Sequence, residues 1–555
     1  MADASIALAP LQTKPRSALF ANRKIVIAAC AGTIFEWYDF FLYGTLAVTL
    51  GAKFFSQFDE TSRNIFALLT FAIGFVVRPL GGLLFGRFGD QLGRKNVFLA
   101  TIVLMGASTF AVGLLPSSET IGLAAPIALL ALRLVQGLAV SGEYGGAVIY
   151  LAEHAPPARR GLYAGLVPAC IGVSLLLTLL VILVAQGALG AAAFDAWGWR
   201  IPFLASAVLV GLALPGRLRL EESPAFLKLK QEDRRSKAPI SEALLRPKNL
   251  RLIAIGLFGM AAGVAATGYT GTIYVLIFMT VALKIDPFTA NVLFAIAMLA
   301  GAGACVGFAW LSDRIGRKPI ILAGCLLAAL CYFPIFKLLT EVANPSLAAA
   351  QRSVTIVVTA DPVTCSFQFN PAGVARFDTG CDKIRSTLAR AGAEYRVEAA
   401  PPGATASVVV GSQTLQSGPS LSDDLTKALA AAGYPTAKDP KVIRIAGLSD
   451  LLAPRSLAMA ALLLALVIFA QMTQGPAAAA LVELFPTSIR YTSMSLPYQI
   501  ATGWIGGLLP ATVFAMNAQA GNMFFGLWYP VIVTAATVGI GLVFLPETKD
   551  RDVAA

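Results

Sequence analysis

The chain has 555 residues, of which 57% are hydrophobic and only 13% are charged, and its mean hydropathy is +0.72. Because a soluble domain carries about 25% charged residues, this composition excludes an ordinary soluble protein and places most of the chain in lipid. The net charge of +12 would suit a nucleic-acid partner, so the positions of the basic residues have to be considered first.

Twelve stretches are apolar and long enough to span a membrane, which takes about 20 residues each. Six run near 25 to 50, 62 to 86, 96 to 115, 121 to 150, 162 to 186 and 197 to 217. Six more run near 250 to 280, 288 to 310, 319 to 340, 455 to 482, 491 to 516 and 523 to 546. The first is too long for a signal peptide and contains Glu36 and Asp39, so we interpret it as a retained helix. We therefore expect an all-α polytopic membrane protein with twelve transmembrane helices.

Lys and Arg gather in alternate loops between these helices. They lie between helices 2 and 3, 4 and 5, 6 and 7, 8 and 9, and 10 and 11, whereas the 3/4 and 11/12 loops contain none. Positively charged loops stay in the cytoplasm, which predicts cytoplasmic tails at 1–24 and 547–555 and a cytoplasmic central loop at 218–249. We therefore interpret the basic excess as a topology signal, and we expect a protein of the bacterial inner membrane without a nucleic-acid partner.

Two motifs occur once in each half of the chain. Asp90 to Lys95 (DQLGRK) returns after 223 residues as Asp313 to Lys318 (DRIGRK). Glu153, Pro156 and Arg160 return after 330 residues, with the same spacing, as Glu483, Pro486 and Arg490. The repeats predict two six-helix pseudo-repeats, 25–217 and 250–546, with 107 extra residues in the second.

The extra residues fit only in the polar stretch 341–453, between helix 9 in 250–340 and helix 10 in 454–546. The predicted topology places this insert in the periplasm. Residues 353–359, 394–399 and 406–411 resemble strands, while 380–391 and 420–432 have helical periodicity, so we expect a small α+β domain. The periplasm permits a disulfide between its two cysteines, Cys365 and Cys381, but the sequence leaves their geometry open.

Few ionisable side chains lie within the predicted helices, where a charge costs about 2.5 to 3.5 kcal/mol at the bilayer centre. Glu36 and Asp39 share a face of helix 1 near mid-depth, and helix 4 carries Arg133 and Glu143. Carboxylates in a partly desolvated site can bind and release protons, which makes Glu36, Asp39 and Glu143 candidates for proton coupling. Arg133 stays charged, and its planar fork matches a carboxylate, so it is a candidate for binding an anionic group.

Uncharged polar residues complete the predicted substrate site. They are Gln136, Tyr43, Tyr269, Gln471 and Tyr498. The alternative is that Arg133 and Arg78 only neutralise Glu36 and Asp39 in a structural cluster. No cofactor is expected. The sequence disfavours an ATP-driven pump because it has no G-x-x-x-x-G-K-[ST] phosphate loop, and a membrane enzyme because the predicted helices have no histidine or metal-ligand cluster.

The charged residues at the loops, with Arg78 on helix 2, are candidates for a gate. One acid and two bases at repeated spacing suggest salt bridges that open and close during transport, although simple topology-determining charge is an alternative. The candidates are Arg78, Asp90, Arg94, Lys95, Glu153, Arg160, Asp313, Arg314, Arg317, Glu483 and Arg490.

These motifs resemble those of the metabolite:proton symporter branch of the major facilitator superfamily. The repeated loops resemble the superfamily's helix 2/3 signature, and Leu129 to Gly137 resembles its helix 4 motif. Gly32 to Gly44, Arg133 to Gly146 and Leu496 to Pro510 are typical of the branch. The resemblance implies proton coupling by the acidic pair of helix 1, Arg133 in the substrate pathway and a gate at the helix 2/3 loop. The insert lies outside the family's pattern.

The sequence thus predicts a monomeric transporter, not an enzyme, that takes up a small carboxylate-bearing metabolite with protons by alternating access. The resemblance to the symporter branch implies that the substrate is a di- or tricarboxylate, a shikimate-like acid, or a zwitterion such as proline or betaine. The alternatives are an exporter or uniporter of the same fold, and a membrane sensor that uses the periplasmic insert.

Overall fold

The computed structural model describes residues 23–57, 70, 72–367, 378–435 and 439–551. Eleven of its helices are long and apolar enough to cross a membrane. The predicted second helix lies partly outside the described residues. Its described part is helical at 72–76 and continues into α5 (Arg78–Leu92). Since lipid offers no partners to backbone N–H and C=O groups, long apolar runs of this kind satisfy them within a helix.

The first bundle comprises the six spans before residue 219. They are α2 (Arg23–Thr45) with α3 (Ala47–Phe54), α5, α6 (Arg94–Leu114), α8 (Ala124–His154), α9 (Arg160–Leu189), and α11 (Arg200–Leu204) with α12 (Ser206–Leu218). Two short helices, α7 (Ser118–Ile121) and α10 (Ala191–Ala193), join them, and α13 (Pro224–Gln231) and α14 (Pro239–Leu245) form the central loop. Helix 1, predicted to run to residue 50, is divided after Thr45.

The second bundle begins with a helix that contains three π-helical turns. This helix 7 consists of α15 (Pro247–Gly256), α16 (Ala262–Tyr269) and α17 (Val275–Ile277), and its π turns are Leu257–Ala261, Thr270–Tyr274 and Phe278–Ala282. The others are α18 (Pro287–Ile315), α19 (Arg317–Ala343), α24 (Pro454–Leu484), α25 (Arg490–Ile500) with α26 (Leu509–Ala520), and α27 (Trp528–Phe544). π turns occur frequently at functional sites, and nothing in the apolar pattern predicted them.

The insert is an α+β domain. It consists of α20 (Pro345–Ser353), β1 (Ile356–Ala360), α21 (Gly380–Arg390), β2 (Arg396–Ala399), β3 (Ser407–Val410), β4 (Gln413–Gln416), α22 (Leu421–Ala431) and α23 (Leu448–Leu451). The sheet order is β2-β1-β3-β4, with β1 parallel to β2 and antiparallel to β3. Strand β4 was not predicted from the sequence. A disulfide joins Cys365 and Cys381, which is one of the two outcomes that the sequence left open.

The insert packs firmly on the second bundle. Its buried Val358, Ile384 and Leu388 belong to the same apolar core as Phe278 of helix 7 and Phe336 of α19. Backbone ties reinforce the junction: the Tyr395 N–H donates to the carbonyl oxygen of Gly521 (2.8 Å), and the Ile445 N–H donates to the Thr289 hydroxyl (2.9 Å). The insert is therefore docked on the second bundle by buried side chains and by hydrogen bonds of its backbone.

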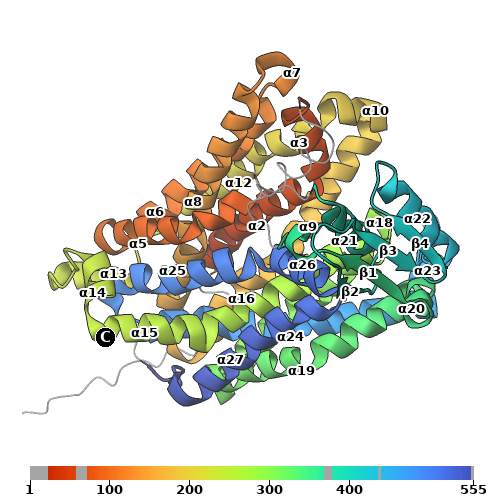
Figure 1. Cartoon of the computed structure of the whole chain (residues 1–555). Coiled ribbons are helices and arrows are strands. Elements are labelled where there is room, and N and C mark those ends of the chain that lie inside the picture. The colour runs from red at the N-terminus through yellow and green to blue at the C-terminus, as the bar shows by residue number, and fades with distance from the viewer. Residues whose placement is uncertain (1–22, 58–69, 71, 368–377, 436–438, 552–555) are drawn as a thin grey trace, which may run out of the picture.

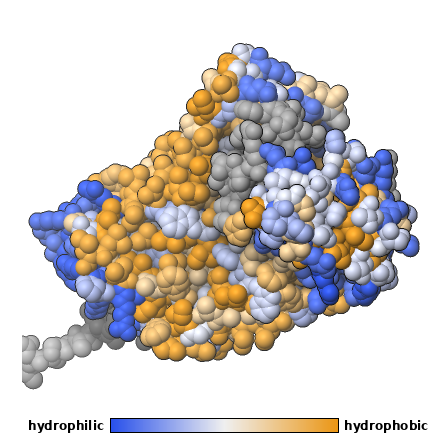
Figure 2. All heavy atoms as spheres, viewed as in Figure 1, coloured by the Kyte–Doolittle hydropathy of each residue, from blue (hydrophilic) through white to orange (hydrophobic). Residues whose placement is uncertain are grey.

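The two bundles meet where α5 packs against α25 and where α9 packs against both α18 and α24. In Figure 1, α13 and α14 lie at one end of the molecule and the insert lies at the other. We call the end with α13 and α14 the basic end. Figure 2 shows an apolar band between the hydrophilic surfaces of these two ends, as expected for a membrane-spanning body.

Candidate functional site

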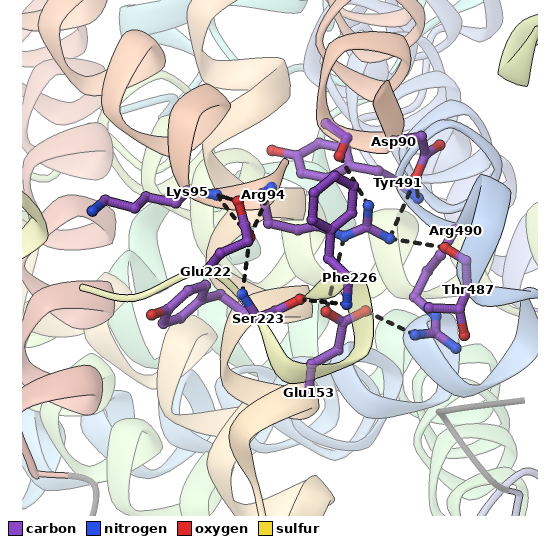
Figure 3. A network of polar contacts seen from close by, with 12 residues as sticks. Asp90, Arg94, Lys95, Glu153, Glu222, Ser223, Phe226, Thr487, Arg490 and Tyr491 are labelled. Carbon is purple, nitrogen blue, oxygen red and sulfur yellow. Dashed lines mark hydrogen bonds and ion pairs between the residues drawn. The ribbon is translucent and has the colours of Figure 1, made fainter. Parts of the chain in front are cut away.

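At the basic end, the first motif joins the bundles through a network that we call the first lock (Figure 3). Asp90 accepts hydrogen bonds from the backbone N–H groups of Tyr491 (3.1 Å) and Thr492 (2.9 Å), at the N-terminus of α25 in the other bundle. Arg94, 3.5 Å from Asp90, donates to the carbonyl oxygen of Thr487 (2.8 Å). A carboxylate at a helix N-terminus satisfies free N–H groups and the helix dipole.

A bridge between the bundles completes the first lock. Arg490 Nη1 lies 2.8 Å from Glu153 Oε1, and both side chains are buried. Arg94 also lies near Glu153, at 3.9 Å. Charges placed this deeply are costly unless they are paired, so the network forms only when the bundles touch at this end.

The second motif forms a second lock of the same design. Asp313 accepts from the backbone N–H groups of Gly161 and Leu162, both at 2.8 Å, at the N-terminus of α9 in the first bundle. Arg317 pairs with Asp313 (2.8 Å) and with Glu483 (3.1 Å). The repeat in the sequence is therefore a repeat of interbundle contacts.

The glycine of each motif has a backbone conformation that other residues rarely adopt. Gly93 has φ 108° and Gly316 has φ 103°, and a side chain would be strained there. Each glycine ends one helix and starts the next, at α5/α6 and α18/α19. This turn places Asp90 beside Arg94, and Asp313 beside Arg317.

Two acids that the sequence analysis missed cap the helices after these glycines. Glu222 accepts from the N–H groups of Arg94 (3.1 Å) and Lys95 (3.3 Å), and Glu547 accepts from those of Arg317 (2.9 Å) and Lys318 (3.1 Å). Burial raises the pKa of Glu547, but these backbone hydrogen bonds outweigh it, so the pKa lies below its ordinary value.

Four predicted gating residues lie outside the locks: Arg78, which lies at the central cavities, and three residues at the basic end. Lys95 is half-buried and makes its contact through its backbone. Arg314 is exposed and lies 3.8 Å over the Trp310 ring. Arg160 donates to the carbonyl oxygen of Arg551 (2.7 Å) instead of bridging to an acid as its counterpart Arg490 does.

Between the two ends, the first bundle holds a buried cluster around Asp39. Its carboxylate accepts from the Thr109 hydroxyl (2.8 Å), the Gln136 amide (3.2 Å) and Arg133 Nη1 (3.2 Å). The Arg133 guanidinium lies 3.5 Å over the Tyr43 ring. Asp39 thus has three donors, whereas the Arg133 Nε and Nη2 atoms have no hydrogen-bond partner among the described residues.

Glu36 lies one turn away and has a different environment. It lines two neighbouring cavities, together with Trp37, Arg78 and Val140. The Glu36 Oε2 atom is buried and has no hydrogen-bond partner in the described part of the chain. Of the three carboxylates predicted for proton coupling, Asp39 and Glu143 each pair with an arginine. Glu36 makes no such ion pair with the described residues.

The first cavity belongs to the first bundle and also reaches Asp39, Arg133 and Gln136. The second lies between the bundles, and its further polar lining residues are Tyr144, Tyr269, Thr272, Gln474, Tyr498, Gln499 and Thr502. Only about 40 Å³ of the second cavity is open to the centres of water molecules, which is room for a few waters and not for a metabolite.

Arg78 faces this second cavity and is not part of the locks. Its Nη1 lies 3.4 Å from the Tyr269 hydroxyl, and its guanidinium lies 4.6 Å over the Phe75 ring. The Tyr498 ring stacks on Tyr144 across the bundle boundary, with ring centres 4.1 Å apart. The sequence analysis assigned Arg78 to the gate. In the structure its side chain instead lines the cavity between the two bundles.

Glu143 is not in either cavity. Arg217 on α12 pairs with it through two hydrogen bonds, and the Thr101 hydroxyl donates to it (3.0 Å). Both side chains are buried. Nor do Tyr43 and Gln471 line the cavities, although Gln474 does.

Comparisons with known proteins agree with this architecture. Residues 25–364 match the Major Facilitator Superfamily, and residues 445–554 match the "Sugar (and other) transporter" family. The insert falls largely between the two matches. A solved proton:xylose symporter superposes with a TM-score of 0.62 at 16% identity, covering 97% of this chain and 98% of the other. This likeness confirms the predicted fold class.

Three relatives from Escherichia coli K12 are more similar in sequence. A shikimate transporter is 38% identical over 322 residues, which are 57% of this chain and 72% of the relative. An inner membrane metabolite transport protein is 36% identical over 60% of this chain and 76% of its own length. A proline/betaine transporter is 37% identical over 58% of this chain and 65% of its own length.

Proposed function

Because the chain belongs to the Major Facilitator Superfamily, in its metabolite:proton symporter branch, we propose that it takes up a small carboxylate-bearing metabolite together with protons. It is a multi-pass membrane transporter and not an enzyme. One observation carries the proposal: Glu36 and Arg78 both line the cavity between the bundles. A group that can take up a proton and a group that can bind an anion therefore share one space.

Glu36 and Asp39 are the proposed proton-coupling groups. We propose that Glu36 takes up a proton from the cavity at its unpartnered Oε2 atom. Asp39 accepts hydrogen bonds from Arg133, Gln136 and Thr109, so a proton that reaches Asp39 would compete with Arg133 for this carboxylate. Glu143 keeps Arg217 bound, and we propose a structural role for that pair instead of a coupling role.

Arg78 is the proposed ligand of the substrate carboxylate. Its guanidinium can form two parallel hydrogen bonds to a carboxylate, and Tyr269 already lies 3.4 Å from Nη1. Tyr498 and Gln474 would contact the remainder of the substrate from the second bundle. Arg133 lines the first cavity but not the second. We propose that its role is to neutralise the charge of Asp39, with which it forms an ion pair.

Both locks are closed at the basic end, which supports a state open or occluded toward the opposite side. By the positive-inside rule the basic end is the cytoplasmic end, so the insert is periplasmic and the membrane is the bacterial inner membrane. Release of the substrate into the cytoplasm then requires that both locks break while the bundles rock about the central cavity.

The relatives narrow the substrate class. Shikimate, proline and betaine, which give two of the relatives their names, differ in net charge but share a carboxylate group. The guanidinium of Arg78 can bind the carboxylate group that these substrates share. Glu36, in the same cavity, would not repel that carboxylate once it is protonated. We propose that the substrate is a monocarboxylate or a zwitterion of about this size.

The test uses purified protein in proteoliposomes with shikimate, proline and glycine betaine. An inward proton gradient should drive accumulation of at least one of them, and dissipating the gradient should leave only equilibration. Arg78→Lys should weaken binding about tenfold or more because the bidentate geometry is lost, while Arg314→Lys on the exposed Trp310 should not.

Accumulation without a gradient, or unchanged affinity in Arg78→Lys, would contradict the proposal. Outward transport would favour the exporter, and gradient-independent equilibration would favour the uniporter. If none of the tested acids crosses the membrane, the result would favour the membrane sensor over a transporter.

A further inference from the structure

A hollow outside the transport site lies where the insert meets α19 and the start of α27. It is lined by Lys337 of α19, Arg352 of α20, Glu394 before β2, and Trp528 of α27. It shares no lining residue with the central cavities. The lining groups come from the insert and from two membrane helices, so the hollow exists only because the insert is docked.

The depth of the hollow corresponds to the surface of a bilayer. Lys337 comes twenty residues after Arg317, the first residue of α19, which is about 30 Å along a helix and matches the hydrocarbon thickness of a membrane. Trp528 is the first residue of α27 and is 47% exposed. Trp and Lys at helix ends are typical of the headgroup level.

The floor of the hollow continues into surface that faces lipid. The Phe333 and Trp528 rings contact each other, with centres 5.1 Å apart. Leu330 is 65% exposed and lies on the same face of α19 as Phe333 and Lys337. One turn after Trp528, Ile532 is 60% exposed. An acyl chain can therefore run from the hollow along both helices.

Two opposite charges in the hollow are not bridged to each other. The Lys337 ammonium and the Glu394 carboxylate make no ion pair or hydrogen bond with any residue that the structure describes. Burial raises the pKa of Glu394, and nearby Lys337 opposes that rise. Arg352 is paired with Glu341 at 3.1 Å. The hollow thus offers one free cation and one half-buried anion above an apolar floor.

We propose that this hollow binds a phospholipid whose headgroup carries both a phosphate and a primary ammonium. The phosphate lies against Lys337 at the edge near Arg352, the ammonium lies against Glu394, and the acyl chains follow Leu330 and Ile532. The lipid comes from the leaflet on the insert side, and it fastens the insert to the membrane without touching the transport site.

The test is native mass spectrometry of the purified full-length protein, titrated with phosphatidylethanolamine, phosphatidylglycerol or phosphatidylcholine of the same acyl chains. We expect preferential retention of phosphatidylethanolamine. Lys337→Gln should lower retention of all three lipids, and Glu394→Gln should lower phosphatidylethanolamine alone by about tenfold, the effect of one charge-assisted hydrogen bond. Lys337→Arg should retain it, because the charge is kept.

Lys427→Gln is the matched control, since this side chain is 80% exposed on α22, away from the hollow. Equal retention of the three lipids by the wild-type protein would overturn the proposal, as would Lys337→Gln and Glu394→Gln variants that behave like the control. Phosphoethanolamine, which lacks acyl chains, should not displace the lipid. If it does so at similar concentration, the site takes a soluble phosphate ester and the lipid assignment is wrong.

Discussion

The locks at the basic end are duplicated in the two halves of the chain, whereas the central site is not. Asp90 caps a helix of the second bundle, and Asp313 caps a helix of the first in the same way. At the repeat offsets of 223 and 330 residues, Arg78 and Arg133, which line the cavities, correspond to Gly301 and Leu463. The lock charges therefore repeat, and the buried central charges do not.

This difference separates two tasks. Closing the bundles at one end requires contacts from both halves, and the duplicated motifs supply two sets in which an Asp caps a helix of the other bundle. Arg490 of the first lock adds a salt bridge between the bundles, whereas its counterpart Arg160 binds a carbonyl oxygen. The proposed coupling uses an acid and a cation that line one cavity, Glu36 and Arg78, and both belong to the first bundle. We infer that the first bundle carries the chemistry while the second presents the uncharged side of the site.

The largest effect on stability is expected inside the first bundle. Glu143→Gln leaves the buried Arg217 without its counter-charge, and breaking a buried ion pair costs about 3 to 5 kcal/mol. Glu36→Gln should cost far less, because the Oε2 atom of Glu36 has no partner to lose. Thermal unfolding of the two purified variants checks this ranking, and similar midpoints would remove the distinction between a structural pair and a coupling acid.

The locks should respond equally to equal changes. Asp90→Asn and Asp313→Asn each weaken two backbone hydrogen bonds to a carboxylate, and we expect each to favour opening of the basic end by about 1 to 2 kcal/mol. Distances between spin labels on the exposed Leu92 and Ile315 report the opening. If only one variant shifts the distances, the locks are not equivalent.

The smallest effect concerns the cap of α19. Because the folded-state pKa of Glu547 is depressed, its stabilisation is present above the ordinary pKa of a glutamate and is lost as the pH falls through the folded value. Glu547→Gln should cost about 1 kcal/mol at pH 7, and the difference from wild type should shrink below about pH 4.5. A difference that is constant with pH would mean that the charge does not contribute.

Much of the fold follows from the sequence because lipid imposes a simple rule of length and polarity. The apolar runs located the spans, and the growth of the repeat offset located the insert. Strand β4 (Gln413–Gln416) was missed because its sequence, QTLQ, is polar and mostly exposed, so pairing with β3 and not an apolar pattern defines it. The break in helix 1 after Thr45 also has no signal in the apolar pattern.

The sequence identified several residues of the site, but it did not predict which side chains they contact. Glu36 and Asp39 do lie at the cavities, but Arg217 was overlooked because a basic residue at a helix end, two positions before Arg219, reads as a topology signal. Glu222 and Glu547 could have been found, since each follows the last helix of a half and precedes Ser or Thr. Which guanidinium meets which carboxylate depends on helix rotation, which the sequence does not fix.

The most direct test of the account is proton movement in proteoliposomes containing wild-type protein or Glu36→Gln, with a transported acid as substrate. Addition of substrate should draw protons inward with the wild type. In Glu36→Gln it should draw none, and uphill accumulation should be lost while exchange of labelled for unlabelled substrate continues. Proton uptake and accumulation that persist in Glu36→Gln would contradict the assignment of coupling to the cavity between the bundles.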